Sequence, residues 1–122
     1  MLTIDAGATV TLNRLTITGG NTGIANSGTV TLNHSTITGN TAGQGGGIYN
    51  FQVPGASPGA TVTLAGTSTI TGNTASGGPN NEGAIGGGIF NFCGTLVNAI
   101  APPTAGANVT NNNPDNIFSE CL

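Results

Sequence analysis

The sequence predicts an all-β fold in which short parallel strands wind into a β-solenoid, a single-stranded parallel β-helix of about four coils. The segment Thr-Val-Thr-Leu occurs at 9–12, 29–32 and 61–64, and Thr-Leu-Val at 95–97 is a degraded fourth copy. The triplet Thr-Ile-Thr occurs at 16–18, 36–38 and 69–71. Short segments begin with isoleucine at intervals of 20, 24 and 41 residues, at Ile4, Ile24, Ile48 and Ile89. Self-similarity with a period of this length is typical of solenoids.

Aligning the four isoleucines divides a single domain, residues 1–122, into four expected coils. The predicted coils are 4–23, 24–47, 48–88 and 89–117, and the polar, Pro-containing C-terminal segment is expected to form a cap at about 112–122. Each coil is expected to hold three strands whose aliphatic side chains point inward while the threonines point outward. Turns are predicted where Gly and Asn, which tolerate positive φ, follow the triplets. The third coil carries the longest insertions.

The same alignment stacks asparagines from coil to coil. One expected column contains Asn21, Asn40, Asn73 and Asn112, and a second contains Asn26, Asn50 and Asn91. Stacked amides hydrogen-bond to one another between successive layers of parallel strands. These columns are interpreted as structural ladders at the turns and not as ligand-binding residues.

Composition excludes several classes of function. Only 4% of the residues are charged, the net charge is −3, and Arg14 is the only strong cation. An average soluble domain has about 25% charged residues. Nucleic-acid binding needs several Lys or Arg contacts to phosphate, so no nucleic-acid partner is expected. No apolar run reaches the roughly 18 residues of a membrane-spanning helix, so no membrane span is predicted.

The two cysteines, Cys93 and Cys121, both lie in the last third of the chain. A disulfide that closes the C-terminal coil would suit an extracellular or cell-surface setting. A pair of buried free thiols is the alternative interpretation. No signal peptide follows Met1, where strand-like residues begin at once. We therefore expect the chain to be a fragment of a longer secreted or surface protein.

A resemblance to known proteins rests on two segments and the repeats around them. The segments are Gly45-Gly46-Gly47-Ile48-Tyr49-Asn50 and Gly86-Gly87-Gly88-Ile89-Phe90-Asn91. Together with Thr-Val-Thr-Leu and Thr-Ile-Thr-Gly-Asn, they resemble the right-handed parallel β-helix repeat proteins of bacteria. They are particularly similar to the polymorphic outer-membrane-protein (Pmp-type) repeats, with their Gly-Gly-x-Ile and Phe-x-x-Asn signatures. The resemblance covers almost the whole chain and implies a right-handed coil in an adhesin, a passenger segment or a polysaccharide-cleaving enzyme.

The sequence predicts no catalytic, cofactor-binding or metal site. Its carboxylates are spread over different coils and corners, at Asp5, Glu82, Asp115 and Glu120. Hydrolysis of a glycosidic bond needs two carboxylates about 5–10 Å apart, so a polysaccharide lyase or hydrolase is the alternative to a non-enzymatic role. A single histidine provides too few ligands for a metal ion. Arg14 and His34 are expected to stack, either as a small anion or sugar contact or as solvated surface residues.

The aromatic residues give the candidate ligand face. Tyr49 and Phe90 occupy one column, and Phe51 and Phe92 occupy another. If Ile48 and Ile89 point inward, these four rings point outward, beside the insertions at 42–47, 52–60 and 75–87. Insertions in solenoids often mark a binding face. The alternative interpretation is that the loops fold over the rings and bury them.

The repeated Thr-x-Thr segments suggest a third class of function, because regular threonine arrays on β-solenoids are similar to those of ice-binding proteins. Threonine is, however, a common outward-facing strand residue in any sheet. The preferred hypothesis is a non-enzymatic, structural or adhesin-like segment of a secreted or cell-surface bacterial protein. It would bind a glycan or a protein through its loop-decorated face, and its exposed first coil could stack end to end with further coils.

Overall fold

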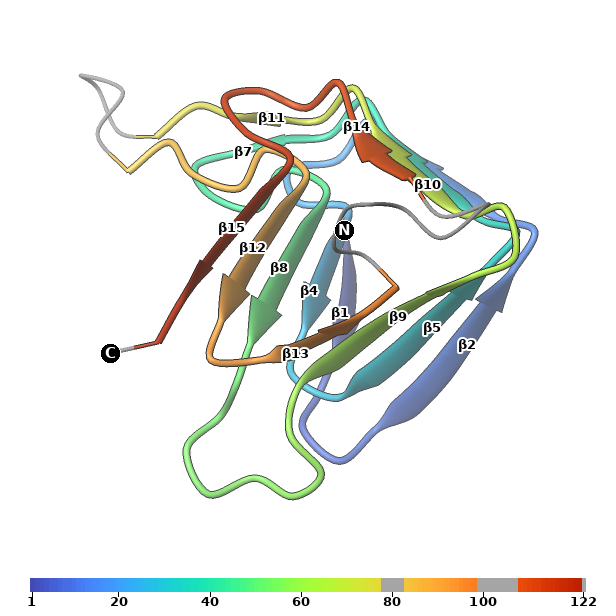
Figure 1. Cartoon of the computed structure of the whole chain (residues 1–122), viewed down its shortest axis with the longest axis vertical. Coiled ribbons are helices and arrows are strands. Elements are labelled where there is room, and N and C mark those ends of the chain that lie inside the picture. The colour runs from blue at the N-terminus through green and yellow to red at the C-terminus, as the bar shows by residue number, and fades with distance from the viewer. Residues whose placement is uncertain (78–82, 99–107, 122) are drawn as a thin grey trace.

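The computed structural model describes residues 1–77, 83–98 and 108–121, and within them every regular element is a β-strand (Figure 1). Three sheets carry most of the chain. Sheet A contains β1 (Leu2–Ile4), β4 (Ile24–Asn26), β8 (Ile48–Phe51), β12 (Ile89–Phe92) and β15 (Ile117–Glu120). Sheet B contains β2 (Thr9–Asn13), β5 (Thr29–Asn33), β9 (Thr61–Ala65) and β13 (Thr95–Val97). Sheet C contains β3 (Thr16–Thr18), β6 (Thr36–Thr38), β10 (Thr69–Thr71) and β14 (Asn108–Thr110).

The chain visits the three sheets in the same order in each repeat and then returns to sheet A beside the strand it left. We call each such repeat a rung. All strand pairs within the described residues are parallel. Figure 1 shows the three sheets surrounding a common interior, with a small fourth sheet of β7 (Thr41–Ala42) and β11 (Thr74–Ala75) outside it. The predicted all-β fold of stacked parallel strands is confirmed, and the arrangement is that of a β-solenoid.

The interior is filled by columns of equivalent aliphatic side chains. β-Branched residues favour strands, and the period-2 alternation places one aliphatic set inside each sheet. The expected alignment of Val10, Val30 and Val62 is confirmed by the register of β2, β5 and β9. The fully buried members of the columns are Ile24, Ile48, Ile89, Val30, Val62, Leu32, Ile37 and Ile70. Burying each such side chain contributes about 2 kcal/mol, so the shared interior is the main source of stability.

The first rung differs from the prediction in its register. Leu2, and not Ile4, pairs with Ile24, and Ile4 pairs with Asn26. The turn at 5–8 after β1 is longer than the corresponding turn at 27–28 after β4. This longer turn compensates for the earlier start of β1, so the strands that follow realign. The equal spacing from isoleucine to valine in the first two coils therefore concealed a shift of two residues.

The predicted asparagine column along sheet A is confirmed from the second rung upward. Asn26 Nδ2 donates to Asn50 Oδ1 at 2.7 Å, and Asn50 Nδ2 donates to Asn91 Oδ1 at 2.7 Å. In the first rung, Ile4 occupies the equivalent position. An aliphatic side chain cannot donate a hydrogen bond, and Asn26 Oδ1 is accordingly buried without a partner within the described residues.

The second asparagine column is confirmed for three of its four members. Asn40 Nδ2 donates to Asn73 Oδ1, and Asn73 Nδ2 donates to Asn112 Oδ1, each at 3.0 Å. Asn21 does not belong to this column and is exposed. Its expected place is taken by Gly20, whose backbone N–H donates to Asn40 Oδ1 at 3.0 Å. In the first turn the asparagine comes one residue later than in the other turns. The last hydrogen bond of the column is therefore made by the backbone N–H of Gly20 and not by an asparagine side chain.

Glycines complete the corner that leads back into sheet A. Each of three sheet A strands is directly preceded by a glycine: Gly23 before β4, Gly47 before β8 and Gly88 before β12. A Cβ on Gly47 would lie 2.5 Å from the carbonyl oxygen of Gly88 and 2.8 Å from Cγ2 of Ile70. Real Cβ atoms cannot approach this closely, so the rungs can stack at their normal spacing only if these residues have no side chain.

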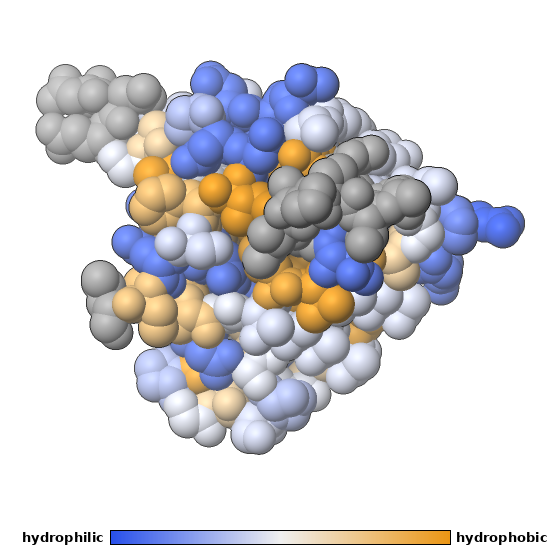
Figure 2. All heavy atoms as spheres, viewed as in Figure 1, coloured by the Kyte–Doolittle hydropathy of each residue, from blue (hydrophilic) through white to orange (hydrophobic). Residues whose placement is uncertain are grey.

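The C-terminal segment differs from the predicted cap. Residues 117–120 form β15, which pairs with β12 in the register Ile89 to Ile117 and Phe90 to Phe118. Only the polar residues before β15 form a corner, and Ile117-Phe118 begins a fifth strand of sheet A. Viewed toward this end, Figure 2 shows hydrophobic residues at the centre, with hydrophilic residues around them.

We predict that Asn50→Ala destabilises the protein much more than Asn33→Ala. The first substitution leaves Asn91 Oδ1 buried without its donor, which should cost about 3 kcal/mol. Asn33 makes an exposed hydrogen bond to Asn13, and its loss should cost less than about 1 kcal/mol. Urea unfolding followed by circular dichroism measures both values, and equal losses would contradict the structural role of the buried column.

Candidate functional site

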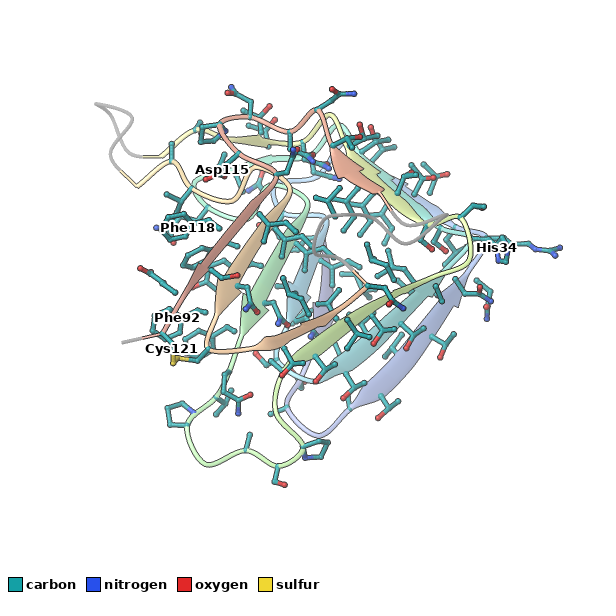
Figure 3. All side chains as sticks on the ribbon, in the orientation of Figure 1. His34, Phe92, Asp115, Phe118 and Cys121 are labelled. Atoms are coloured by element: carbon teal, nitrogen blue, oxygen red, sulfur yellow. A yellow bond between two sulfur atoms is a disulfide. The ribbon has the colours of Figure 1, made fainter. Side chains whose placement is uncertain are left out.

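The outer face of sheet A carries two columns of aromatic rings, which we call the aromatic ladder. Tyr49, Phe90 and Phe118 form one column, and Phe51 and Phe92 form the other. Ring centroids are 5.1 Å apart for Tyr49 and Phe90, and 5.9 Å for Phe90 and Phe118. Those of Phe51 and Phe92 are 5.5 Å apart. These separations are typical of favourable aromatic pairs, and Figure 3 shows Phe92 and Phe118 on the outer side of sheet A.

The rings of the ladder are not equally accessible. Phe90 is only 2% exposed because the rings of Tyr49, Phe92 and Phe118 lie around it. The other four rings are half-buried. Of the four predicted face residues, Tyr49, Phe51 and Phe92 can therefore be reached by a partner, whereas Phe90 supports them from below. The sequence analysis missed Phe118, although Ile117-Phe118 repeats the pattern of Ile89-Phe90.

The insertion at 52–60 is held by Gln52 at the end of β8. The backbone N–H of Ala60 donates to Gln52 Oε1 at 2.6 Å, and Gln52 Nε2 donates to the carbonyl of Val53 at 3.0 Å. Figure 1 shows this loop extending beyond the ends of β8 and β9 and not across sheet A. One amide side chain therefore closes the loop.

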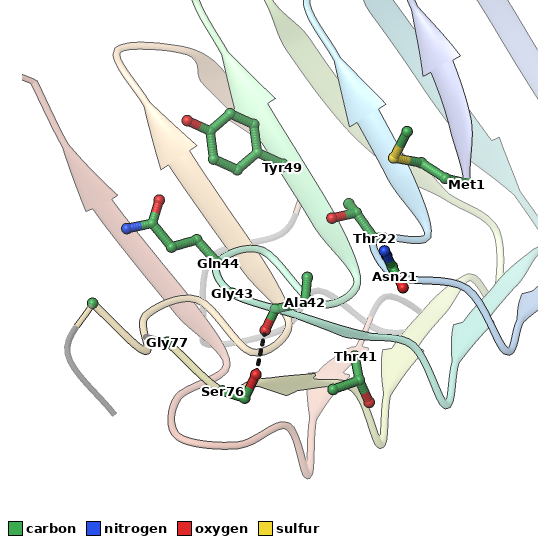
Figure 4. A pocket seen from close by; sticks show the side chains of 11 residues that line it. Met1, Asn21, Thr22, Thr41, Ala42, Gly43, Gln44, Tyr49, Ser76 and Gly77 are labelled. Carbon is green, nitrogen blue, oxygen red and sulfur yellow. Dashed lines mark hydrogen bonds between the residues drawn. The ribbon is translucent and has the colours of Figure 1, made fainter. Parts of the chain in front are cut away.

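A groove of about 750 Å³ adjoins the ladder at Tyr49, at the corner between sheet C and sheet A (Figure 4). Its polar lining includes Asn21, Thr22, Thr41, Gln44 and Ser76. The groove was not predicted from the sequence. It arises because this corner differs in length between rungs: residues 21–22 form a short turn, whereas 41–46 and 74–87 are insertions. The described residues of the longer corners that line the groove, 41–44, 76–77 and 83, form a wall beside the shorter one.

Hydrogen bonds between the two longer corners make this wall a continuous ladder. β7 pairs with β11, and the backbone N–H groups of Ser76 and Gly77 donate to the carbonyls of Ala42 and Gly43 at 2.7 and 3.0 Å. Ser76 Oγ donates to the same Ala42 carbonyl at 3.2 Å. Because the backbone is paired, the position of the side chains along the groove is fixed.

The ionisable side chains do not gather at the groove within the described residues. Asp5 lies in the turn after β1, and Glu120 lies in β15. The Asp115 carboxylate accepts hydrogen bonds from the backbone N–H groups of Gly86 and Gly87 at 2.6 and 3.2 Å, so it holds the last corner. Glu82 lies outside the described residues. The described part of the chain contains no group of three His, Cys, Asp or Glu residues that could hold a metal ion.

Arg14 and His34 lie at the corner between sheets B and C, away from the groove. The backbone N–H of Arg14 donates to the carbonyl of Asn33, directly before His34, so the two residues stack as expected. The His34 ring lies over Gly66, and its Nδ1 is 2.9 Å from Asn33 Oδ1. Figure 3 shows His34 projecting away from the body of the protein. This pair therefore does not contribute to the aromatic face.

Cys93 and Cys121 form a disulfide with a Cα–Cα distance of 4.5 Å. It ties the end of β15 to the turn between β12 and β13. Since Phe118 lies on β15, the disulfide also keeps that ring against Phe90. The structure therefore has the disulfide, and not the pair of buried free thiols that was the alternative interpretation.

The chain matches no protein-family model, no curated protein and no solved structure. Its parallel sheets and its stacked Thr and Asn repeats define it as a β-solenoid protein by structure alone. In the described residues, no helix is long and apolar enough to cross a membrane.

We predict that Phe90→Ala costs about 3–5 kcal/mol of unfolding free energy, because it empties a buried position. Phe92→Ala should cost less than half of this, because the Phe92 ring is already half-exposed. Urea unfolding of the two variants compares the losses. A larger loss for Phe92→Ala would contradict the arrangement of the ladder.

We predict that the double variant Cys93→Ser/Cys121→Ser loses about 3–4 kcal/mol, as expected for a loop with a sequence separation of 28 residues. Hydrogen exchange should show the largest loss of protection in 117–120, because the edge strand is no longer tied. Unchanged protection of these amides would show that the pairing of β15 with β12 is sufficient on its own.

Proposed function

We propose that this chain is a right-handed, single-stranded parallel β-helix segment of a secreted or cell-surface bacterial protein, with a structural or adhesin-like and non-enzymatic role. It contacts a glycan or a protein partner through the outer face of sheet A. The observation that supports this function best is the aromatic ladder: four half-buried rings, stacked in register on one face, beside a groove.

Right-handedness is supported by the general preference of parallel strands in one sheet for right-handed crossover connections. Each return from sheet A to the next strand of sheet A is such a connection. The repeated Gly-Gly-Gly-Ile-aromatic-Asn segments support the Pmp-type assignment. The disulfide supports a location outside the reducing cytosol.

The aromatic ladder suits a contact surface for two physical reasons. Large rings with few rotatable bonds bury much area on binding and lose little conformational entropy, which is why aromatic residues dominate binding hot spots. The rings are also fixed by their neighbours before binding, since Phe90 and the disulfide support them. A preorganised surface binds more tightly because less order must be created.

Binding of the labelled protein to a glycan array and to host-cell surfaces tests the proposal. The double variant Tyr49→Ala/Phe92→Ala should lose at least tenfold in apparent affinity because two accessible rings are removed. The control is Thr31→Ala/Thr63→Ala, on the outer face of sheet B, which should bind like the unmodified protein. Phe90 is avoided because its loss is expected to destabilise the fold. Equal binding by both double variants would refute the role of the ladder.

Polysaccharide cleavage is not proposed, since no observation favours it: the described carboxylates occupy separate corners and Asp115 is used by the backbone. A specific observation does favour the second candidate, ice binding. Sheet B stacks Thr9, Thr29, Thr61 and Thr95 in exact register, and sheet C stacks Thr18, Thr38, Thr71 and Thr110. Such columns repeat about every 4.8 Å across the strands.

For this second candidate, we expect thermal hysteresis and faceted ice crystals at millimolar protein concentration. Replacing Thr31 and Thr38 with lysine should abolish the effect of the respective face, which would also show which sheet is responsible. Round ice crystals at all concentrations would eliminate ice binding.

A further inference from the structure

We infer that the groove beside Tyr49 binds a short stretch of a neutral polysaccharide, which lies along the solenoid axis across the first three rungs. Tyr49 stacks on a sugar ring, and the Asn21 and Gln44 amides hydrogen-bond to sugar hydroxyls. The inference depends on the proposed function, since it names the ligand class and its place on the same face. It adds a polar groove that shares Tyr49 with the ladder.

The direction of the groove follows from the rungs that contribute to its lining. Asn21 belongs to the corner after the first rung, Gln44 to the corner after the second, and Tyr49 lies on β8 of the third. Gln44 and Tyr49 lie in the same turn of the solenoid, and Ser76 belongs to the corner after the third rung. Neighbouring rungs are about 4.8 Å apart, so the three corners that hold Asn21, Gln44 and Ser76 extend over about 10 Å along the axis. Figure 4 shows Tyr49 and Gln44 on one side of the hollow and Asn21 and Thr22 on the other. An extended chain fits this shape better than a compact ligand does.

The polar groups of the groove are available for a ligand. Within the described part of the chain, the side-chain amides of Asn21 and Gln44 make no hydrogen bond to the protein, in contrast to the asparagines of both columns. Asn21 and Thr41 are exposed, and Gln44 is half-buried. Each amide provides both donors and an acceptor, which matches sugar hydroxyls that donate and accept.

Tyr49 supplies the one aromatic ring among the described lining residues, and Met1 and Ala42 add smaller apolar surfaces. Tyr49 is half-buried, held from one side by Phe90 at 5.1 Å and by Phe51 at 6.3 Å between ring centroids. Its ring is thus fixed, and its hydroxyl keeps a polar end. The C–H face of a pyranose can pack on such a ring while its hydroxyls meet the amides. A purely hydrophobic ligand would leave those amides without partners, which is costly.

Charge favours a neutral polymer over an acidic one. None of the described lining residues has a charged side chain, and the lining includes Met1, which carries the N-terminal amino group. Arg14, the only Lys or Arg of the chain, lies at a different corner. An acidic polysaccharide would bring carboxylates to a site without a cationic side chain, on a protein whose net charge is already −3. The unfavourable field lowers both its association rate and its affinity. The groove volume of about 750 Å³ lies within the range of small-molecule sites.

The test combines calorimetric titration with ¹H–¹⁵N NMR spectra of the full chain. The probes are cellohexaose, mannohexaose and N-acetylchitohexaose as neutral oligosaccharides, and hexagalacturonate as the acidic one. We expect at least one neutral probe to bind and to shift the amide signals of 21–22, 41–44, 49 and 76–77. Hexagalacturonate should bind at least tenfold more weakly.

The variants separate the groove from the rest of the face. Asn21→Ala and Gln44→Ala should each weaken binding at least fivefold, and Tyr49→Ala at least tenfold, whereas Tyr49→Phe retains the ring. Asn13→Ala is the matched control because it removes an exposed asparagine from sheet B. Phe92→Ala removes a ladder ring that does not line the groove, so it should weaken oligosaccharide binding less than Tyr49→Ala does. Circular dichroism confirms folding of each variant.

The outcomes distinguish the inference from the proposed function. If binding is lost in Phe92→Ala but retained in Gln44→Ala and Asn21→Ala, the groove is not the site, while the ladder remains the contact surface. Tighter binding of hexagalacturonate than of every neutral probe would overturn the neutral ligand class. Absence of binding by all neutral probes would also overturn the inference, whereas loss of array or cell binding in the ladder variant would still support the proposed function.

Discussion

Stacking of equivalent residues in register is the constraint on which the rest of this structure depends. Once Val10 lies under Val30 and Val30 under Val62, the interior can be filled by identical columns, and each backbone strand finds its hydrogen-bonding partner in the next rung. The same stacking places like amides on one another, so the amides of both columns hydrogen-bond to the neighbouring rung. The glycines at the corner into sheet A allow the rungs to approach this closely.

The candidate site is a consequence of where this regularity is interrupted. The strands repeat faithfully, but the corner between sheets C and A varies in length from rung to rung, and the wall of the groove consists of the two longer corners. The aromatic ladder, in contrast, results from the regular repeat, because its rings occupy outward-facing positions of sheet A that stack in register. Scaffold and site therefore use different parts of the repeat, so the corners can vary without disturbing the interior.

The repeats were sufficient to predict most strands of sheets A, B and C, the inward columns and most of the asparagine ladders, because strand alternation and layer stacking follow directly from residue spacing. They did not predict β7, β11 or β15. Spacing alone could not determine the register of β1, where a longer turn compensates for an earlier strand, nor the absence of Asn21 from its column. It also could not identify the buried ladder of Ser35 and Ser68, in which each Oγ donates to a carbonyl of the preceding rung, because serine is equally common in exposed turns. The burial of Phe90 could not be predicted either, because it is caused by the neighbouring rings. The groove could not be predicted because it is formed by insertions that do not repeat from rung to rung.

Both asparagine columns have a polarity. In each, Nδ2 donates toward the rung that comes later in the chain, from Asn26 to Asn50 to Asn91 and from Asn40 to Asn73 to Asn112. The unpartnered Asn26 Oδ1 is the acceptor end of one of these vectors. A rung therefore cannot be inserted in the inverted direction. A transplanted or duplicated rung must donate hydrogen bonds to the rung that follows it in the chain and accept them from the rung that precedes it. Modular engineering of this scaffold is thus restricted to head-to-tail insertion.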